Sequence, residues 1–145
     1  MKSWRSSRAP SGWKFTGFTD TVHNHVKYHR CSRYKKNWFG WCGGHCSGTI
    51  KTTLRKCGKA RLKFGNCAKR GYVVAKLNGR QVGRANAYQS KTIVFAFKDG
   101  DILELSDIGI SIIEFDDLNT ISCNKCSITK SKTSGKYSMC TAILD

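Results

Sequence analysis

The chain has 145 residues and a formal net charge of +17, which suits one domain with a buried core rather than two. It contains no apolar run of the roughly 18 residues that a membrane-spanning helix needs, and no apolar signal segment follows its basic start. The charge excess favours an anionic partner, such as a phosphate backbone, a sulfated glycan or an anionic lipid surface.

Charge is unevenly distributed along the chain. Residues 1–98 hold 22 Lys and Arg against one acid, Asp20, whereas residues 99–122 hold seven acids and no base. These two segments can pair within one molecule or between molecules, and the sequence does not decide between the two.

The first predicted unit is a basic, aromatic-rich arm over residues 1–47, in which neither a helical nor a strand period persists. We expect an irregular backbone here, held to the rest of the chain by disulfides. The second unit, residues 48–145, has short strand-like runs of alternating side chains. These runs cover residues 49–54, 60–66, 72–85, 91–105, 110–115, 118–123 and 137–144.

Two turn signals organise these runs. Asn78-Gly79 is typical of a type I′ hairpin turn, and Asp99-Gly100 predicts a second bend of the same kind. No stretch combines helical periodicity with caps. The sequence therefore predicts an all-β fold, an antiparallel β-sandwich or jelly roll with a disulfide-tethered N-terminal arm.

The cysteines fit disulfides better than zinc. The spacings Cys42-x3-Cys46, with His45 inside it, and Cys123-x2-Cys126 suggest zinc, but a zinc scheme leaves four cysteines unexplained. Disulfides use the even number of cysteines completely and predict a secreted, extracellular protein, although the pairing stays open. The predicted disulfide cysteines are Cys31, Cys42, Cys46, Cys57, Cys67, Cys123, Cys126 and Cys140.

We expect no catalytic residue, no cofactor and no metal site. The histidines of "HNHVKYH" lie in the basic arm and are expected to be solvated. Asp116 and Asp117 could join Glu104 or Asp107 as calcium ligands, but no EF-hand spacing is present and turn chemistry also explains these acids.

The function that we expect is binding of an anionic polymer or carbohydrate, above all a sulfated or acidic glycan, across a basic face within residues 59–84. Trp38 and Trp41 are expected at its margin if they are exposed, although covering the core is the commoner role of clustered aromatics. The predicted basic ligand-binding residues are Lys59, Arg61, Lys63, Lys69, Arg70, Lys76, Arg80 and Arg84. The chain has the general look of extracellular lectin-like sandwich modules, without a diagnostic family motif.

Two other classes remain open. One is a structural or adhesive matrix protein, or a defence protein directed at an anionic membrane, although the chain lacks an amphipathic helix to insert. The other is an intracellular, zinc-containing nucleic-acid binder, which the charge suits but the irregular cysteine spacing does not. The sequence does not indicate the oligomeric state.

Overall fold

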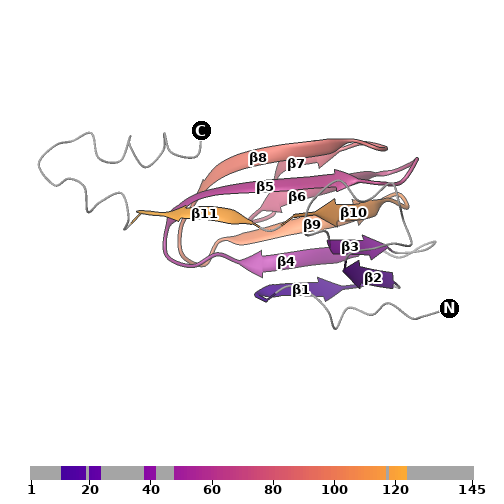
Figure 1. The fold of residues 1–145 in the computed structure, drawn as a ribbon. Coiled ribbons are helices and arrows are strands. Elements are labelled where there is room, and N and C mark those ends of the chain that lie inside the picture. The colour runs from indigo at the N-terminus through magenta and orange to yellow at the C-terminus, as the bar shows by residue number, and fades with distance from the viewer. Residues whose placement is uncertain (1–10, 19, 24–37, 42–47, 117, 124–145) are drawn as a thin grey trace, which may run out of the picture.

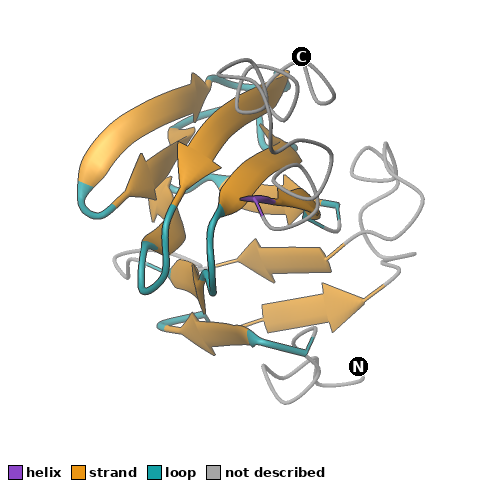
Figure 2. Ribbon diagram, turned by 90° about the vertical axis from the view of Figure 1, so that its left-hand side faces the viewer, coloured by secondary structure: helices purple, strands orange, loops and turns teal. Residues whose placement is uncertain are grey.

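The computed structural model describes residues 11–18, 20–23, 38–41, 48–116 and 118–123. This part of the chain forms eleven strands in two layers (Figures 1 and 2). The strands are β1 (Trp13–Thr16), β2 (Asp20–His23), β3 (Trp38–Trp41), β4 (Thr49–Thr53), β5 (Gly58–Asn66), β6 (Tyr72–Leu77), β7 (Arg80–Ala85), β8 (Ser90–Phe97), β9 (Ile102–Ile108), β10 (Ile112–Phe115) and β11 (Asn119–Ser122).

Two antiparallel sheets make up the sandwich. Sheet A has the order β1-β4-β9-β6-β7, and sheet B has the order β11-β5-β10-β3-β2 with β8 paired to the other edge of β5. β11 and β10 pair with β5 one after the other, β11 beside residues 58–61 and β10 beside residues 64–66. The predicted all-β antiparallel sandwich is confirmed. Within the described part, no helix is long and apolar enough to cross a membrane.

The core lies between the sheets and follows from the alternation of side chains along each strand. On β5, Ala60, Leu62 and Phe64 are fully buried, whereas Arg61 and Lys63 between them are exposed. Successive strand residues point to opposite faces, so apolar and basic residues separate without any break in the strand. The core continues through Ile50, Val73, Ala75, Leu103, Leu105, Ile113 and Phe115.

Three strands come from the segment that the sequence predicted to be an irregular arm. β1 pairs with β4 in sheet A, while β3 pairs with β10 and β2 pairs with β3 in sheet B. The expectation of irregular backbone is therefore wrong for these strands. Each is only four residues long, too short for the sequence to show a persistent period, and pairing with a longer partner supplies its order.

The first hairpin signal is confirmed. Asn78 and Gly79 both have positive φ, 52° and 82°, as a type I′ turn requires, and they join the paired strands β6 and β7. Asparagine and glycine tolerate this left-handed backbone better than other residues do.

The second signal marks a turn of another kind. β8 pairs with β5 in sheet B, whereas β9 pairs with β4 and β6 in sheet A, so Asp99-Gly100 carries the chain from one sheet to the other. Gly100 has a φ of 88°, and the Asp101 amide donates to the Lys98 carbonyl at 3.1 Å. A tight turn signals a reversal of direction, but only the partners of the two strands decide whether they form a hairpin.

We predict that Leu62→Ala lowers the free energy of unfolding by about 2–5 kcal/mol, because Leu62 is fully buried and its loss leaves a cavity. Its register partner on β8 is Ile93, and the neighbouring Val94, 38% exposed, offers the control. Val94→Ala should cost less than about 1 kcal/mol, measured by denaturant unfolding with unchanged slope. Equal losses for the two variants would contradict the assignment of the β5 faces.

Candidate functional site

Two chain segments meet at one end of the sandwich and are bonded to each other. The Leu54 amide donates to the Asp101 carbonyl at 2.7 Å, and the Gly100 amide donates to the Leu54 carbonyl at 2.8 Å. The Lys56 amide donates to Asp99 Oδ1 at 2.7 Å. The β4–β5 loop and the β8–β9 turn therefore form one connected rim, in which backbone polar groups are satisfied without regular pairing.

A cleft of about 560 Å³ opens at this end, between the ends of the two sheets. β1 and β4 form one side of it, and β11 with the end of β8 forms the other. Its lining residues are Ser11, Trp13, Thr52, Thr53, Leu54, Arg55, Phe97, Leu118 and Thr120.

The chemistry of the cleft is an apolar wall with polar groups at its opening. The half-buried Trp13 indole packs on Phe115 with ring centroids 4.9 Å apart, which fixes its orientation. Thr53, Arg55 and Thr120 are exposed, and none forms a side-chain hydrogen bond or ion pair within the described residues. The cleft thus combines aromatic surface, exposed hydroxyls and one guanidinium.

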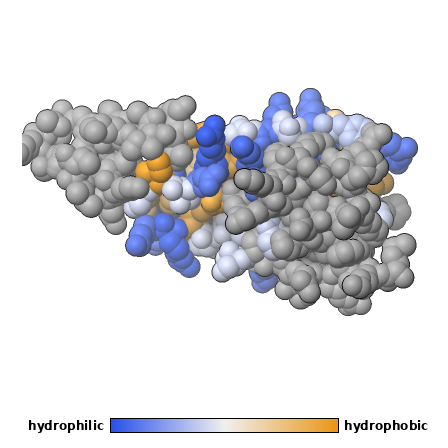
Figure 3. Space-filling model, viewed as in Figure 1, coloured by the Kyte–Doolittle hydropathy of each residue, from blue (hydrophilic) through white to orange (hydrophobic). Residues whose placement is uncertain are grey.

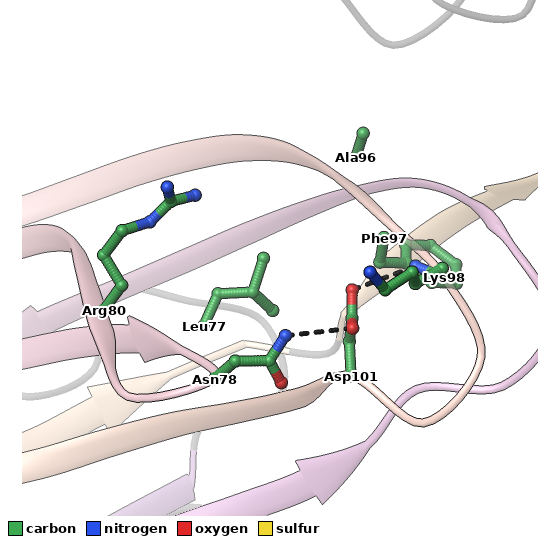
Figure 4. A pocket seen from close by; sticks show the side chains of 7 residues that line it. All are labelled: Leu77, Asn78, Arg80, Ala96, Phe97, Lys98 and Asp101. Atoms are coloured by element: carbon green, nitrogen blue, oxygen red, sulfur yellow. Dashed lines mark hydrogen bonds between the residues drawn. The ribbon is translucent and has the colours of Figure 1, made fainter.

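A second hollow of about 390 Å³ lies on the other side of Phe97. Figure 4 shows Arg80 and Lys98 at its edges, with the side chain of Leu77 between them. The carboxylate of Asp101, at one wall, is hydrogen-bonded within the protein. Oδ1 accepts from Asn78 Nδ2 at 3.0 Å, and Oδ2 accepts from the Lys98 amide at 3.0 Å. These hydrogen bonds lower the pKa of Asp101 below its ordinary value, and the bond from Asn78 has the larger effect.

The predicted basic residues do not form one face. Lys59, Arg61 and Lys63 lie on the outer side of sheet B, because the alternate residues of β5 face the core. Lys76 and Arg84 lie on the outer side of sheet A, where β6 and β7 belong. Two hairpin-like runs that are close in sequence therefore end on opposite surfaces of the sandwich. In Figure 3, the hydrophilic side chains of one face likewise stand in separate groups with paler and hydrophobic surface between them.

The other predicted bases differ in what they contact. The Arg84 guanidinium lies 3.7 Å from the centre of the Tyr72 ring, and its Nε donates to Asn86 Oδ1 at 2.8 Å. Lys69 and Arg70 are in the β5–β6 loop, at the opposite end of the sandwich from the cleft. None of the predicted binding residues lines the cleft, and only Arg80 lines the second hollow.

The two tryptophans of the predicted margin are separated as well. Trp38 packs against the core and pairs in register with Phe115, whereas Trp41, three residues on, pairs with Ile112. Odd spacing along a strand puts the two indoles on opposite sides of sheet B, so they do not form one stacking platform. The role of core cover, which the sequence analysis named as the commoner one, applies to Trp38.

The acidic segment is used mainly inside the molecule. Lys51 Nζ lies 3.4 Å from Glu104 Oε1, and Ser106 donates to Glu104 Oε2 at 2.7 Å. Asp107 accepts from the backbone amide of Ser111 at 2.8 Å. Among the described residues, no group of three or more His, Cys, Asp or Glu is placed to hold a metal ion, and Asp117 lies outside them.

Three of the predicted disulfide cysteines are described. Cys67 is disulfide-bonded, while Cys57 and Cys123 are free thiols. The other five lie outside the described residues, so the full pairing scheme stays a prediction.

The residues of the cleft were not identified from the sequence. Trp13 is one of many aromatics in the N-terminal segment, and Arg55 is one of two adjacent bases in a loop. Their available signal was weak: an aromatic within an alternating "WKFT" run that could have been read as a strand. They come together only when β1 pairs with β4, with Trp13 opposite Thr52.

The comparisons with known proteins concern the fold. No family model matches the chain, and no curated protein matches its sequence. Among solved structures, TmCBM61 in complex with β-1,4-galactotriose is similar, with a TM-score of 0.53 and 15% identity over 77% of this chain and 89% of that one. The secreted serine protease VesC from Vibrio cholerae gives 0.52 with 6% identity over 72% of this chain, which spans only 24% of VesC. CBM35 from Paenibacillus barcinonensis gives 0.46 with 16% identity over 77% and 94%. At such identities the likeness to TmCBM61 and to the matched part of VesC shows a shared β-sandwich fold.

The low pKa of Asp101 leads to a prediction on pH. Its carboxylate should stabilise the fold fully above the unfolded-state pKa of about 4, and this contribution should disappear as the pH falls through the lower folded-state pKa. In Asp101→Asn, an NH2 group replaces one of the two carboxylate oxygens, so either the Lys98 amide or the Asn78 side chain loses its acceptor. The melting temperature of the parent should exceed that of the variant at pH 7, and the difference should shrink below about pH 4. A difference that is constant between pH 7 and pH 2 would contradict this.

Proposed function

We propose that the chain is a non-catalytic carbohydrate-binding module that holds an acidic glycan in the cleft of about 560 Å³. The observation that carries the proposal is the meeting of the Trp13 indole, the exposed hydroxyls of Thr53 and Thr120, and the Arg55 guanidinium in one opening. Its volume lies within the range of roughly 300–1,000 Å³ that small-molecule sites occupy.

Each part of the cleft matches a part of a sugar. The C–H face of a sugar ring is apolar and packs on an aromatic surface, and its hydroxyls exchange hydrogen bonds with threonine side chains. Arg55 is the single charged residue in the lining, and a guanidinium binds a carboxylate or sulfate through two parallel hydrogen bonds. The acidic class of glycan follows from this residue.

The similarity in fold to TmCBM61, whose structure contains a galactotriose, supports the proposal at the level of the sandwich as a scaffold for sugar binding. Fold alone does not assign function, so the residues of the cleft carry the proposal. The eight cysteines and the disulfide of Cys67 support an extracellular setting.

The bases on the outer side of β5 favour a second, weaker contribution: attraction of an anionic polymer. Arg61 faces Val94 on β8 and Asn119 on β11, so no acid opposes it in register. Lys63 faces Thr92 on β8, and on its other side it lies next to Asp116, whose amide donates to the Lys63 carbonyl at 3.0 Å. Neither base forms an ion pair within the described residues. Charges at such positions raise association rates and give binding that weakens with salt. This attraction would act equally on an anionic matrix polymer, an anionic membrane surface or a nucleic acid.

We predict that Arg55→Ala weakens the binding of an acidic oligosaccharide by roughly 10- to 100-fold, since a charged hydrogen-bonded partner is lost. The matched control is Arg61→Ala, which removes an equally exposed arginine from the outer side of β5 and should change the affinity less than about threefold. Calorimetric titration with uronate-containing and neutral oligosaccharides measures both. The proposed site would be wrong if Arg61→Ala weakened binding and Arg55→Ala did not.

A second prediction concerns retention on a heparin column. Arg61→Ser with Lys63→Ser should lower the salt concentration of elution, because both side chains are exposed on one surface and neither forms an ion pair within the described residues. Arg80→Ser with Arg84→Ser should lower it less, because Arg84 is engaged by Tyr72 and Asn86. Binding of this kind falls linearly in log affinity with log salt. Equal elution of both double variants would show that the position of these charges does not matter.

A further inference from the structure

Cys57 and Cys123 face each other across the β5–β11 pair. Ser122 lies opposite Gly58 in the antiparallel register, so the next position pairs Cys123 with Cys57. The Cys123 amide donates to the Cys57 carbonyl at 2.9 Å, which extends the ladder to this pair. Residues directly opposite each other project from the same face of a sheet.

The spacing of such a pair suits a disulfide. Facing residues of an antiparallel ladder have Cα atoms about 4.5 Å or 5.5 Å apart, depending on the type of pair. Disulfides span Cα separations of about 4.4–6.8 Å. The Cα separation that this pairing implies therefore falls within the range that a disulfide spans.

The backbone around the pair is held on both sides. A Cβ added at Gly58 would clash with the Ile121 carbonyl oxygen, so this glycine allows β11 to lie close against β5. On the other side, Lys56 has a φ of 67°, and its amide is bonded to Asp99. A left-handed non-glycine residue persists only where its surroundings fix it. The facing position of the thiols is thus set by contacts outside the pair.

The two thiols also interact with each other. A side-chain hydrogen bond with Cys57, in which the protonated Cys123 thiol donates, and then burial raise the pKa of Cys123 above its ordinary value. The thiolate is the form that attacks a disulfide, so attack by Cys123 should be slower at neutral pH than in alkaline solution.

We propose that Cys57 and Cys123 are a site of reversible oxidation, at which exchange with a small disulfide such as oxidised glutathione forms a cross-strand bond between β5 and β11. One cysteine thiolate attacks the small disulfide, forms a mixed disulfide and releases one small thiolate. The second cysteine thiolate attacks the protein sulfur of the mixed disulfide and releases the other. Two protein thiols are oxidised, one small disulfide is reduced to two thiols, and the two protons pass to the released thiolates.

The bond would fasten the strand that forms one side of the cleft. β11 contributes Thr120 to the lining, and its end at Ser122 pairs with Gly58 of β5. A covalent bond there removes conformations from the unfolded chain over the long segment between the two cysteines. This consequence does not depend on which ligand the cleft binds.

The sequence makes the bond easy to detect by peptide mapping. Cleavage after Lys and Arg places Cys57 in residues 57–59 and Cys123 in residues 99–125, and each peptide contains one cysteine. Cys126 falls in the next peptide, residues 126–130, so the two neighbouring cysteines are distinguished. The full chain is incubated with oxidised glutathione at about pH 8.5, near the pKa of a free thiol, then alkylated, digested and analysed by mass spectrometry.

The expected product is a disulfide-linked pair of residues 57–59 and 99–125, which disappears on reduction. Its formation should raise the melting temperature by roughly 5–15 °C relative to the untreated chain. Cys57→Ser and Cys123→Ser should each abolish both the linked pair and the shift, while Asn119→Ser, on the same strand, should keep both. Alkylation of both cysteines after treatment, or linkage of 99–125 to another peptide in the parent, would overturn the proposal.

Discussion

Strand β5 is hydrogen-bonded along both edges, to β8 on one side and to β11 and β10 in succession on the other. Because three strands take their register from it, the alternation within β5 is imposed on the whole of that region of sheet B. Its inner residues Leu62 and Phe64 build the core, and its outer residues Arg61 and Lys63 carry charge to the surface. A shift of one residue would exchange these two sets, which the burial of the apolar set opposes.

The ends of β5 also place the features on which binding and oxidation depend. Its first residue, Gly58, lies beside β11, and this contact brings Cys57 to Cys123 and Thr120 to the cleft. The loop before it is bonded to the β8–β9 turn, which closes the same end of the sandwich. The cleft and the thiol pair are therefore consequences of one strand arrangement.

The strand arrangement also decides where the acids of the segment 99–122 lie. Acids of the segment 99–122 accept hydrogen bonds from backbone amides or contact a lysine, as Asp99, Asp101 and Glu104 do. The basic segment 1–98 and the acidic segment 99–122 thus pair within one molecule at Lys51 and Glu104. With these three acids bonded within the fold, the exposed bases give the surface its sign, which bears on encounter with anionic partners more than on the fold.

Local pattern was sufficient for the fold class, because alternation with period two and a turn such as Asn78-Gly79 depend only on neighbouring residues. It also identified most strands after residue 48, whereas the four-residue strands β1 to β3 are ordered by their partners. The local pattern did not predict which sheet each strand joins. The sequence does not encode locally that β8 and β9 part at Asp99-Gly100, or that Lys63 and Lys76 face opposite surfaces. The cleft of Trp13, Arg55 and Thr120 unites segments far apart along the chain, and only long-range pairing could place them together.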